Sequence, residues 1–328
     1  MNPLSPWTGV IDDTLLRLTN VAGVVGRYRA GLVRNYGGTL DQVAYDLTTA
    51  DRDFVLPFEW RSEARADALG AVPPTGRFPP YSPSPAEQYL STRRLVIDEE
   101  LSNTLPSSAN GVFIARDDDG LFYVYKPGDM EMYGGLNWIP HVPGQLARRE
   151  VAGYRIFDAL GAGARVPPTA LVTGPHGPGM AQLFVPLKAS KNWHEYPKVH
   201  QQQTAVGHFV LGNLDENEAN IRPEYDGRNE EHDPDDNMVV FDLGHSIPET
   251  ADPRRGGEDF SLGSPFVDRW AGEELEHNIL GPVRAATRDS LGSPLEDLEL
   301  SDSSIDGVLD RLAYVQSTGT VAAEWPVR

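Results

Sequence analysis

Cysteine is absent from the 328 residues of this sequence. Disulfide bonds, thiol nucleophiles and thiolate metal sites are therefore excluded. Basic residues are also scarce, because 28 lysines and arginines accompany 48 acidic residues and leave a formal net charge of −20. Nucleic acids and anionic membranes bind to basic faces, so this balance disfavours both as the main partner. A small anionic substrate is still compatible with it where a few cations converge.

Long apolar runs are missing as well. No stretch approaches the roughly 20 apolar residues that span a bilayer, so no transmembrane segment is expected. The opening residues, MNPLSPWTGVIDD, have neither the basic start nor the apolar centre of a signal peptide. We therefore expect a soluble, cytoplasmic protein. Its composition, 40% hydrophobic and 23% charged, suits one large globular domain or two lobes.

Several common catalytic signatures are missing too. The sequence has no GxxxxGK[ST] phosphate loop, no HExxH zinc motif and no GxSxG nucleophile elbow, and its histidines are scattered. The acid-rich stretch NLDENEAN at 213–220 does not fit a calcium-binding EF-hand loop. Ala219 stands where an oxygen ligand belongs, and Asp226 stands where a bidentate glutamate belongs. A solvated loop and a catalytic loop are the interpretations left for it.

The chain divides into three parts. Residues 12–50 have a helical pattern, and residues 71–86 contain six prolines and are typical of an extended linker. We therefore predict an N-terminal helical and proline-rich extension at 1–90, ahead of a first lobe at 91–187 and a second lobe at 188–328.

The first lobe is predicted to be rich in β-structure. Two short β-prone runs, 111–116 and 121–126, flank an Asp119-Gly120 turn signal and predict a hairpin. The apolar spacing over 144–160 predicts a helix that ends at Gly161. Two more strands are expected at 169–174 and 180–187. Together these elements predict a small sheet with one helix packed on it.

The second lobe is predicted to be mostly helical. A helix is expected to enter the 213–220 loop, and a buried strand is expected at 237–244. Residues 266–288 are amphipathic, and residues 303–317 place their apolar side chains on one face. The fold class that follows is α+β and bilobal, with a β-rich N-lobe that carries one helix, a mostly helical C-lobe and a cleft near residue 185.

Five residues suit phosphoryl transfer, which needs a lysine on the nucleotide phosphates, an acid that orients it, a base, and oxygen ligands for Mg²⁺. Lys126 ends a strand, and Glu150 shares an inward helix face with aromatic residues. Asp215 and Asn220 have D-x-x-x-x-N spacing, and Asp242 ends a strand. Each residue alone has an ordinary explanation, such as a surface lysine or a turn-capping aspartate. Their common order and spacing favour a site.

The same segments resemble a known superfamily. VYKP (124–127), LARREVAGYRIFDALGAGARVPPT (146–169), GPHGPGMAQLFV (174–185), GNLDENEAN (212–220) and VVFDLGHSIP (239–248) are similar to the phosphatidylinositol 3- and 4-kinase-related superfamily. The likeness is strongest to its little-characterised actinobacterial branch, with HipA-like kinases as more distant relatives. It covers roughly residues 107–250 and implies a protein-kinase-like fold.

The resemblance implies a role for each matching position, with ATP and Mg²⁺ as cofactors. Lys126 would bind the α- and β-phosphates of ATP, and Glu150 would be its ion-pair partner. Asp215 would be the catalytic base, while Asn220 and Asp242 would hold Mg²⁺. The remaining nucleotide contacts would come from a phosphate-covering loop at 107–111, a hinge and an adenine pocket, at Ser107, Ser108, Asn110, Leu183, Phe184, Val185 and Val124.

Two features depart from the family pattern. Glu216 and Asn217 stand where lipid kinases of the superfamily have Arg and His, so a cation and an imidazole are missing from the catalytic loop. His245 follows Asp242 by three residues and either compensates for this loss or is an ordinary turn histidine. The acidic segment 224–237 is either a solvated loop or an electrostatic selector of substrates.

Three functions are consistent with this pattern. One is an ATP- and Mg²⁺-dependent phosphotransferase whose acceptor is a protein or small-molecule hydroxyl rather than a membrane lipid. A second is a nucleotide-binding pseudokinase or interaction module that uses residues 1–90 to contact a partner. A third is transfer of AMP on the same fold.

Overall fold

The protein is described here from a computed structural model, which covers residues 76–103, 110–133, 139–188, 191–215, 220–225, 236–249 and 262–325. Several sequence predictions lie outside these ranges. They are the helix over 12–50, Ser107 and Ser108 of the phosphate-covering loop, the departures at Glu216 and Asn217, and most of the acidic segment 224–237.

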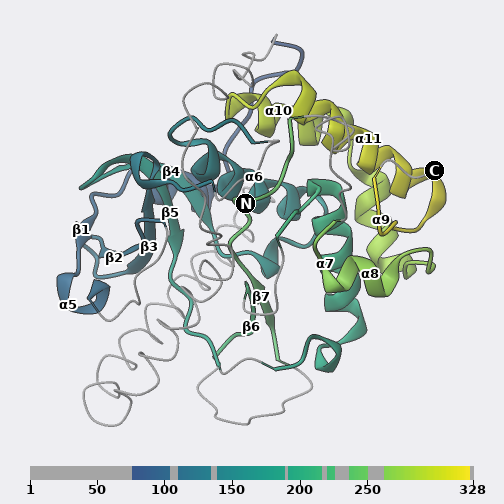
Figure 1. The fold of residues 1–328 in the computed structure, drawn as a ribbon, viewed down its shortest axis with the longest axis horizontal. Coiled ribbons are helices and arrows are strands. Elements are labelled where there is room, and N and C mark those ends of the chain that lie inside the picture. The colour runs from purple at the N-terminus through teal and green to yellow at the C-terminus, as the bar shows by residue number, and fades with distance from the viewer. Residues whose placement is uncertain are drawn as a thin grey trace, which may run out of the picture.

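Five short strands form an antiparallel sheet on one side of the molecule (Figure 1). In spatial order they are β1 (Val96–Ile97), β2 (Phe113–Arg116), β3 (Phe122–Pro127), β5 (Gly177–Leu183) and β4 (Thr169–Gly174). Along the chain, the short helix α5 (Glu99–Ser102) connects β1 to β2. Arg116 pairs with Phe122, which confirms the predicted hairpin. The strand expected at 180–187 begins earlier and ends at Leu183, because the chain leaves the sheet there to enter the second lobe.

The two faces of this sheet have different neighbours. Side chains alternate along a strand, so Tyr123 and Tyr125 of β3 share one face. Both are fully buried, in a cluster that includes Leu90 of the helix α4 (Pro85–Ser91). Val124 and Lys126 therefore lie on the opposite face, the side on which Met180 of β5 joins the core around α6 (Gln145–Ala159).

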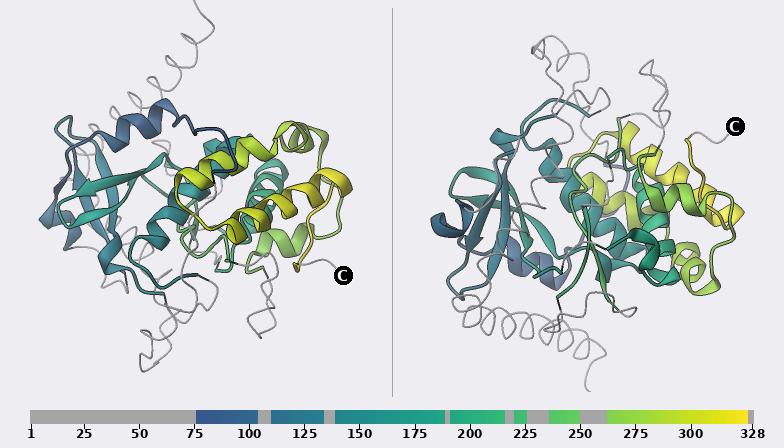
Figure 2. Two further views of the ribbon diagram at one scale, coloured as in Figure 1. Left: turned by 90° about the horizontal axis from the view of Figure 1, so that it is seen from above. Right: turned by 60° about the horizontal axis from the view of Figure 1, so that its bottom comes forward.

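Helix α6 matches the prediction for 144–160 and lies between the two lobes (Figures 1 and 2). Twelve of its 15 residues are buried, so it is an internal element rather than a surface helix. Gly144 precedes it and offers no capping side chain, but Glu131 accepts hydrogen bonds from the amides of Leu146 (3.1 Å) and Ala147 (2.7 Å). After the helix, Gly161 adopts a φ of 74° and ends it, as predicted.

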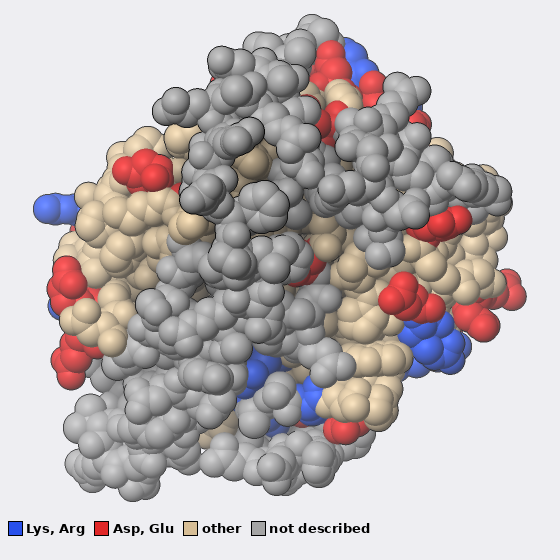
Figure 3. Space-filling view, viewed as in Figure 1, with Lys and Arg blue, Asp and Glu red and all other residues tan. Residues whose placement is uncertain are grey.

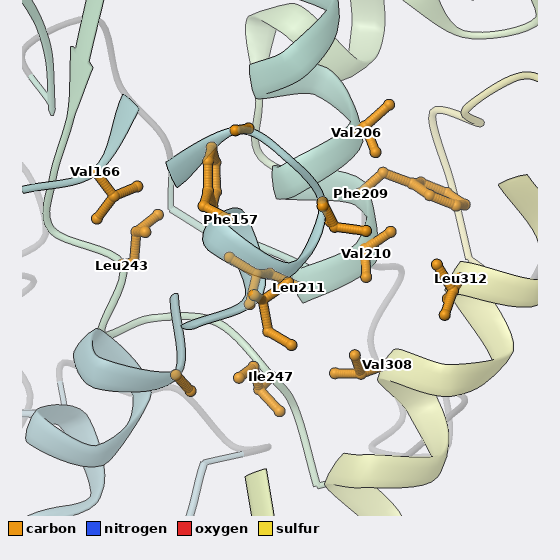
Figure 4. Close-up of a cluster of buried hydrophobic side chains, with 14 of the residues drawn as sticks. Phe157, Val166, Val206, Phe209, Val210, Leu211, Leu243, Ile247, Val308 and Leu312 are labelled. Atoms are coloured by element: carbon orange, nitrogen blue, oxygen red, sulfur yellow. The ribbon is translucent and has the colours of Figure 1, made fainter. Parts of the chain in front are cut away.

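The second lobe is helical. Its helices are α7 (Lys198–Leu211), α8 (Pro265–Trp270), α9 (His277–Ala285), α10 (Arg288–Asp297) and α11 (Asp302–Thr318). Figure 4 shows how Phe157 of α6, Phe209 and Leu211 of α7, and Val308 and Leu312 of α11 meet in its core. Since apolar side chains of α6 belong to this core, the predicted helix of the first lobe also supports the second.

The amphipathic segment predicted at 266–288 is not one continuous helix. It is split into α8 and α9 at Gly272, which has a φ of 75°. The amide of Gly272 donates to the carbonyl of Val321 (2.9 Å), and the amide of Leu275 donates to that of Gly319 (3.1 Å). These bonds to the chain beyond α11 replace the helical ones, and local periodicity gives no sign of them.

A small hairpin lies beside the end of the first sheet (Figure 1). Strand β6 (Ile221–Pro223) pairs with β7 (Met238–Val240) in antiparallel register. The strand predicted at 237–244 is shorter than expected, because Asp242 adopts a left-handed backbone with a φ of 59°. Three 3-10 turns complete the described elements, at Gly128–Met130, Gly163–Arg165 and Trp193–Glu195.

Residues 76–91 connect the two lobes on the outside, and we call them the N-terminal strap. In Figure 2, the strap passes from the helical lobe to α4, which lies along the sheet lobe. Arg77 forms ion pairs with Asp302 (3.1 Å) and Asp306 (2.9 Å) of α11. The described part of the proline-rich segment is therefore packed on the main domain.

The buried carboxylate of Glu87 in the strap is paired with a buried arginine of α6. Arg155 is 6% exposed and donates through Nε to Oε1 of Glu87 (3.0 Å), which is 3% exposed. Its Nη1 donates to Asp297 of α10 (2.8 Å) and to the carbonyl of Pro294 (2.7 Å). The guanidinium carbon also lies 4.0 Å from the ring centroid of Tyr81. Strap, α6 and α10 are thus joined by one side chain.

We predict that Arg155→Met destabilises the protein by about 3–5 kcal/mol, because it leaves the buried carboxylate of Glu87 without its cation. Urea unfolding measures this free energy. The matched control is Arg148→Met on the same helix, whose ion pair with Glu299 is exposed and contributes at most about 1 kcal/mol. The double variant Arg155→Met/Glu87→Gln should recover part of the loss. A cost below that of the control would contradict the prediction.

A second buried polar group lies in the core of the helical lobe. His208 on α7 is fully buried between the rings of Phe157 and Phe266, and its Nδ1 lies 2.9 Å from Oγ of Ser264. Burial lowers the pKa of His208 to about 3. In the unfolded chain the same imidazole has a pKa near 6.5, so the unfolded state binds a proton that the folded state does not hold.

We therefore predict acid sensitivity that originates in His208. Below pH 6.5 the unfolded state gains this proton, so the free energy of unfolding falls by about 1.4 kcal/mol per pH unit until the folded-state pKa is reached. Urea unfolding between pH 7.5 and 5 should show a shallower decline for His208→Gln than for the wild type. The exposed His277 provides the control variant, His277→Gln. Equal slopes in all three proteins would refute the assignment.

Candidate active site

Lys126 lies between two carboxylates. Its Nζ is 2.9 Å from Oε1 of Glu150 on α6 and 2.6 Å from Oδ1 of Asp242, which follows β7. Strand β3, helix α6 and the segment after β7 each supply one of these groups. Side chains more than 20 residues apart in sequence are thereby brought into one partly buried ion cluster.

This cluster changes the acidity of both carboxylates. Burial raises the pKa of Glu150 to about 7, although Lys126 opposes the shift, and the charge of Asp242 adds to it. For Asp242 burial also acts to raise the pKa, but Lys126 and then His245 outweigh it and hold the pKa below its ordinary value. Two carboxylates therefore share one lysine, and Asp242 is the one that remains ionised most readily.

Glu150 also fixes the backbone next to Asp242. Its second oxygen, Oε2, accepts a hydrogen bond from the amide of Leu243 (2.8 Å). Asp242 itself has a φ of 59°, a conformation that non-glycine residues adopt uncommonly. The carboxylate of Asp242 is thus aimed at Lys126 by a backbone turn that α6 holds in place.

Asn220 lies across the β6–β7 hairpin from this turn. The amide of Phe241 donates to the carbonyl of Asn220 (3.1 Å), so Asn220 and Asp242 are at the same end of the hairpin. Asn220 is 1% exposed, and among the described residues its side-chain Oδ1 has no hydrogen-bond partner. A buried amide oxygen that lacks a donor in the described part of the chain, at the end of the hairpin that also carries Asp242, fits the oxygen ligands that Mg²⁺ requires.

A larger metal centre is not found in the described ranges, where no three His, Cys, Asp or Glu side chains gather in a suitable group. An Mg²⁺ ion bound through one carboxylate and one amide would need further oxygens. Magnesium usually keeps several waters and takes oxygens from substrate phosphates. The pair of Asp242 and Asn220 therefore suits a metal that arrives with a nucleotide.

Asp215 approaches the site from the loop after α7. Its Oδ2 lies 3.0 Å from Nδ1 of His245, and its main-chain oxygen accepts from Nδ2 of Asn220 (3.4 Å). The amide of Asp215 bonds to Oδ1 of Asn213 (3.2 Å), and the amide of Leu214 bonds to the carbonyl of His245 (3.0 Å). The loop that carries Asp215 is thus fastened to the segment that carries Asp242.

A pocket opens beside these groups. Its lining includes Lys126, Glu150, Asp242 and His245. Asn110 and Gly111, the described end of the predicted phosphate-covering loop, line it from the β-lobe. They are held by hydrogen bonds from the amide of Met132 to Oδ1 of Asn110 (2.5 Å) and from the amide of Gly111 to the carbonyl of Met130 (3.2 Å).

The predicted adenine side lies along the end of the sheet. Val124 is 7% exposed and is on the same strand face as Lys126. Leu183 faces the other way, into the cluster around Tyr123, and the amide of Phe184 donates to the carbonyl of Phe122 (2.9 Å). Val185 is partly buried against an apolar cluster formed by Leu187, Val239 and Phe241. Of the three predicted hinge residues, Val185 is the one that packs against this apolar cluster.

The structure brings Lys126, Glu150 and Asp242 together in the pocket lining, to which Asn110 also belongs. Asp215 and Asn220 do not line this pocket, but Asp215 is joined to it through His245, and Asn220 is bonded to Asp215. Glu131 and Gly244 also line the pocket and were not predicted from the sequence. Burial raises the pKa of Glu131, which caps α6. Gly144 was the sequence signal for a capping residue such as Glu131. A helix that begins after glycine has no capping side chain there, so its capping oxygen must come from another part of the chain.

Comparisons with known proteins add a likeness of fold. No protein-family model matches the chain, and no curated protein matches it. Among solved structures, the proinflammatory kinase CtkA of Helicobacter pylori is 11% identical, with 70% of this chain and 93% of that chain covered and a TM-score of 0.41. Golgi casein kinase is 12% identical, with 89% and 88% covered and a TM-score of 0.41. At these values the likeness says nothing about activity.

The architecture is a bilobal α+β fold. It has an antiparallel β-lobe with one internal helix, a chain crossing after β5, and a helical second lobe. The predicted α+β class, with a β-rich first lobe that carries one helix and a mostly helical second lobe, is confirmed. Across the described ranges, every helix is too short or too polar to cross a membrane.

Proposed function

We propose that this protein is an ATP- and Mg²⁺-dependent phosphotransferase of the phosphatidylinositol 3- and 4-kinase-like superfamily. The observation that carries the proposal is the ion cluster of Lys126, Glu150 and Asp242 at the edge of one pocket, with Asn220 and Asp215 beside it. A phosphoryl transferase needs these five groups, and four separate elements contribute them.

Lys126 and Glu150 would serve the nucleotide. The ammonium group would bind phosphate oxygens of ATP, and Glu150 would keep it oriented through the 2.9 Å ion pair. Glu150 is well suited to this task because its other oxygen is fixed by the amide of Leu243. Val124 and Val185 would contribute the apolar surroundings of the adenine.

Asp242 and Asn220 would hold the magnesium ion. When bound, Mg²⁺ bridges phosphate oxygens and offsets the charge that develops on the transferred group. The ion would also relieve a local excess of negative charge, since Lys126 now faces both Asp242 and Glu150. The buried Oδ1 of Asn220, which has no hydrogen-bond partner among the described residues, supports this role more directly than its spacing in the sequence does.

Asp215 would act as the base that accepts the proton of the acceptor hydroxyl. His245 lies 3.0 Å from its carboxylate and, when its Nδ1 carries a proton, donates to it and fixes its orientation. Glu216 and Asn217 carry no positive charge at the positions where the related kinases have Arg and His. His245 supplies an imidazole from the metal side of the site instead.

The acceptor is best sought among protein or small-molecule hydroxyls. The chain carries a net charge of −20, and on the face in Figure 3 the described Lys and Arg side chains lie in small groups among Asp and Glu. An anionic lipid surface attracts clustered basic residues, and this face offers no extended cluster in its described part. A basic peptide or an uncharged small molecule is electrostatically better matched.

Two carboxylate variants test the proposal. We predict that Asp215→Asn lowers turnover of ATP by about 10²–10⁴-fold with binding of Mg·ATP retained, because the general base is lost. Asp242→Asn should instead abolish the Mg²⁺-dependent part of the thermal stabilisation by ATP, because a metal ligand is lost. Asp289→Asn, on the exposed start of α10, is the control and should match the wild type.

The outcomes separate the possible functions. Wild-type turnover in both carboxylate variants would refute the assignment of this site. Stabilisation by Mg·ATP without turnover under any acceptor tested would favour a nucleotide-binding pseudokinase or interaction module. Intact-mass measurement of the modified acceptor distinguishes a transferred phosphoryl group from a transferred AMP.

A further inference from the structure

The segment from Asp242 to Ile247, which we call the metal loop, is held in a strained backbone conformation. Both of its terminal residues have positive φ, 59° at Asp242 and 56° at Ile247. For a β-branched residue such as Ile247 this is a genuine outlier. Strained residues of this kind persist only where the surroundings over-determine them, and they cluster at functional sites.

Consecutive residues of α6 hold the two ends of the metal loop. At one end, Glu150 accepts from the amide of Leu243 (2.8 Å). At the other end, Nε of Arg149 donates to the carbonyl of Ile247 (3.2 Å). Neighbouring side chains of one helix therefore fix both strained positions of a loop almost 100 residues away in sequence.

Arg149 is positioned for this task by a buried network. It is 0% exposed, its Nη1 donates to the carbonyl of Gln145 (3.2 Å), and its Nη2 lies 3.2 Å from Oε1 of Glu249. The same carboxylate accepts from Ser301, the N-cap of α11. The one hydroxyl proton of Ser304 is within reach of Oε1 of Glu249 (3.3 Å) and of the carbonyl of Ile247 (3.3 Å), so α11 offers a donor to one of these two acceptors at a time.

The opposite edge of the metal loop is bound to the base-bearing loop. The amide of Leu214 donates to the carbonyl of His245 (3.0 Å), and the amide of Ile247 donates to the carbonyl of Leu211 (2.9 Å). The side chains of Leu243 and Ile247 both belong to the core that Figure 4 shows. Any movement of Ile247 would therefore reach His245 and, through it, Asp215.

Close packing also joins α6 to the metal loop. A Cβ atom on Gly153 of α6 would lie 2.5 Å from Cδ1 and 2.8 Å from Cβ of Leu243. Only a glycine lets the helix approach the loop so closely. Helix and loop therefore behave as one packed unit, with hydrogen bonds at both ends and a steric match in the middle.

We propose that Arg149 is a positioning residue of this active site, which acts with Glu150 to couple helix α6 to the metal ligand Asp242 and to the His245–Asp215 pair. The inference rests on the proposed function and deepens it. A displacement of α6 would move the partner of Lys126, the metal ligand and the orienting imidazole together. The bond from Arg149 to Ile247 is the part of this coupling that lies outside the ion cluster.

The test separates positioning from simple stabilisation. Arg149→Met leaves Glu249 buried without its cation, so stability alone would fall in that variant. The double variant Arg149→Met/Glu249→Gln removes both charges and restores a neutral pair, while the bond to the carbonyl of Ile247 is still missing. The control is Arg148→Met, which removes the adjacent, more exposed arginine.

We expect the double variant to unfold near the wild-type urea midpoint. Its kcat should still fall about 10²-fold, because misplacement of catalytic groups has costs of that order. The Mg²⁺ concentration for half-maximal turnover should rise about tenfold, because the displaced Asp242 would bind the ion less tightly. Arg148→Met should leave both values unchanged. Recovery of wild-type kcat and Mg²⁺ dependence in the double variant would show that Arg149 is only structural.

A measurement that needs no activity completes the test. Amide hydrogen exchange of the peptide over 241–248 should be faster in the double variant than in the wild type or in Arg148→Met, because Leu243 and Ile247 lose their fixed geometry. Unchanged exchange would overturn the proposal even if the protein turned over no ATP. Absence of Mg·ATP binding by the wild type would instead overturn the proposed function, and the exchange result would still decide the coupling.

Discussion

The contact on which the rest of the site depends is the ammonium group of Lys126 between Glu150 and Asp242. Charged groups leave water only where they are paired, and here one cation serves two carboxylates. The imbalance explains why burial and Asp242 together raise the pKa of Glu150 to about 7. A divalent cation beside Asp242 would offset this negative charge and let Lys126 turn away from that carboxylate. The excess of negative charge in the cluster is therefore consistent with the proposed Mg²⁺ site.

Helix α6 connects this ion cluster to the remainder of the molecule. Glu150 binds the metal loop, Arg149 binds its far end, and Arg155 holds the strap and α10. The helix has few exposed positions, so its polar side chains are structural connections rather than a solvated face. An N-terminal segment that pulled on the strap would act on the same helix that orients Lys126.

Much of the fold could be predicted from local sequence signals. The hairpin turn at Asp119-Gly120, the helix that ends at Gly161 and the amphipathic spacing of α11 are each specified by residues close in the chain, and each was found where expected. The break between α8 and α9 was missed because bonds to residues 319 and 321 cause it. The early end of β7 was missed for a similar reason, since the left-handed turn at Asp242 is held by α6.

The residue types of the candidate site could be predicted from the sequence, but the contacts that hold them could not. Spacing and strand ends indicated Lys126, Asp215, Asn220 and Asp242, because groups at the ends of helices and strands can face a cleft. Arg149 had no such signal. Next to Arg148 and Glu150 it is indistinguishable from an exposed helix position, and only the return of residues 247–249 to the start of α6 buries it. Long-range burial of a charge is a tertiary property that periodicity does not encode.

The contacts of His245 link the loop after α7 to the segment that follows β7. In this chain the loop after α7 supplies Asp215 but no cationic neighbour at 216 or 217, while the metal loop supplies both Asp242 and the imidazole that touches Asp215. The proposed base, Asp215, and the proposed metal ligand, Asp242, are thus both connected to a single strained segment, six residues long. Because Arg149 and Glu150 fix that segment at its two ends, proton acceptance and metal binding would respond together to any change in α6. The orientation of Asp215 therefore depends on helix α6 through His245 and the segment that carries it.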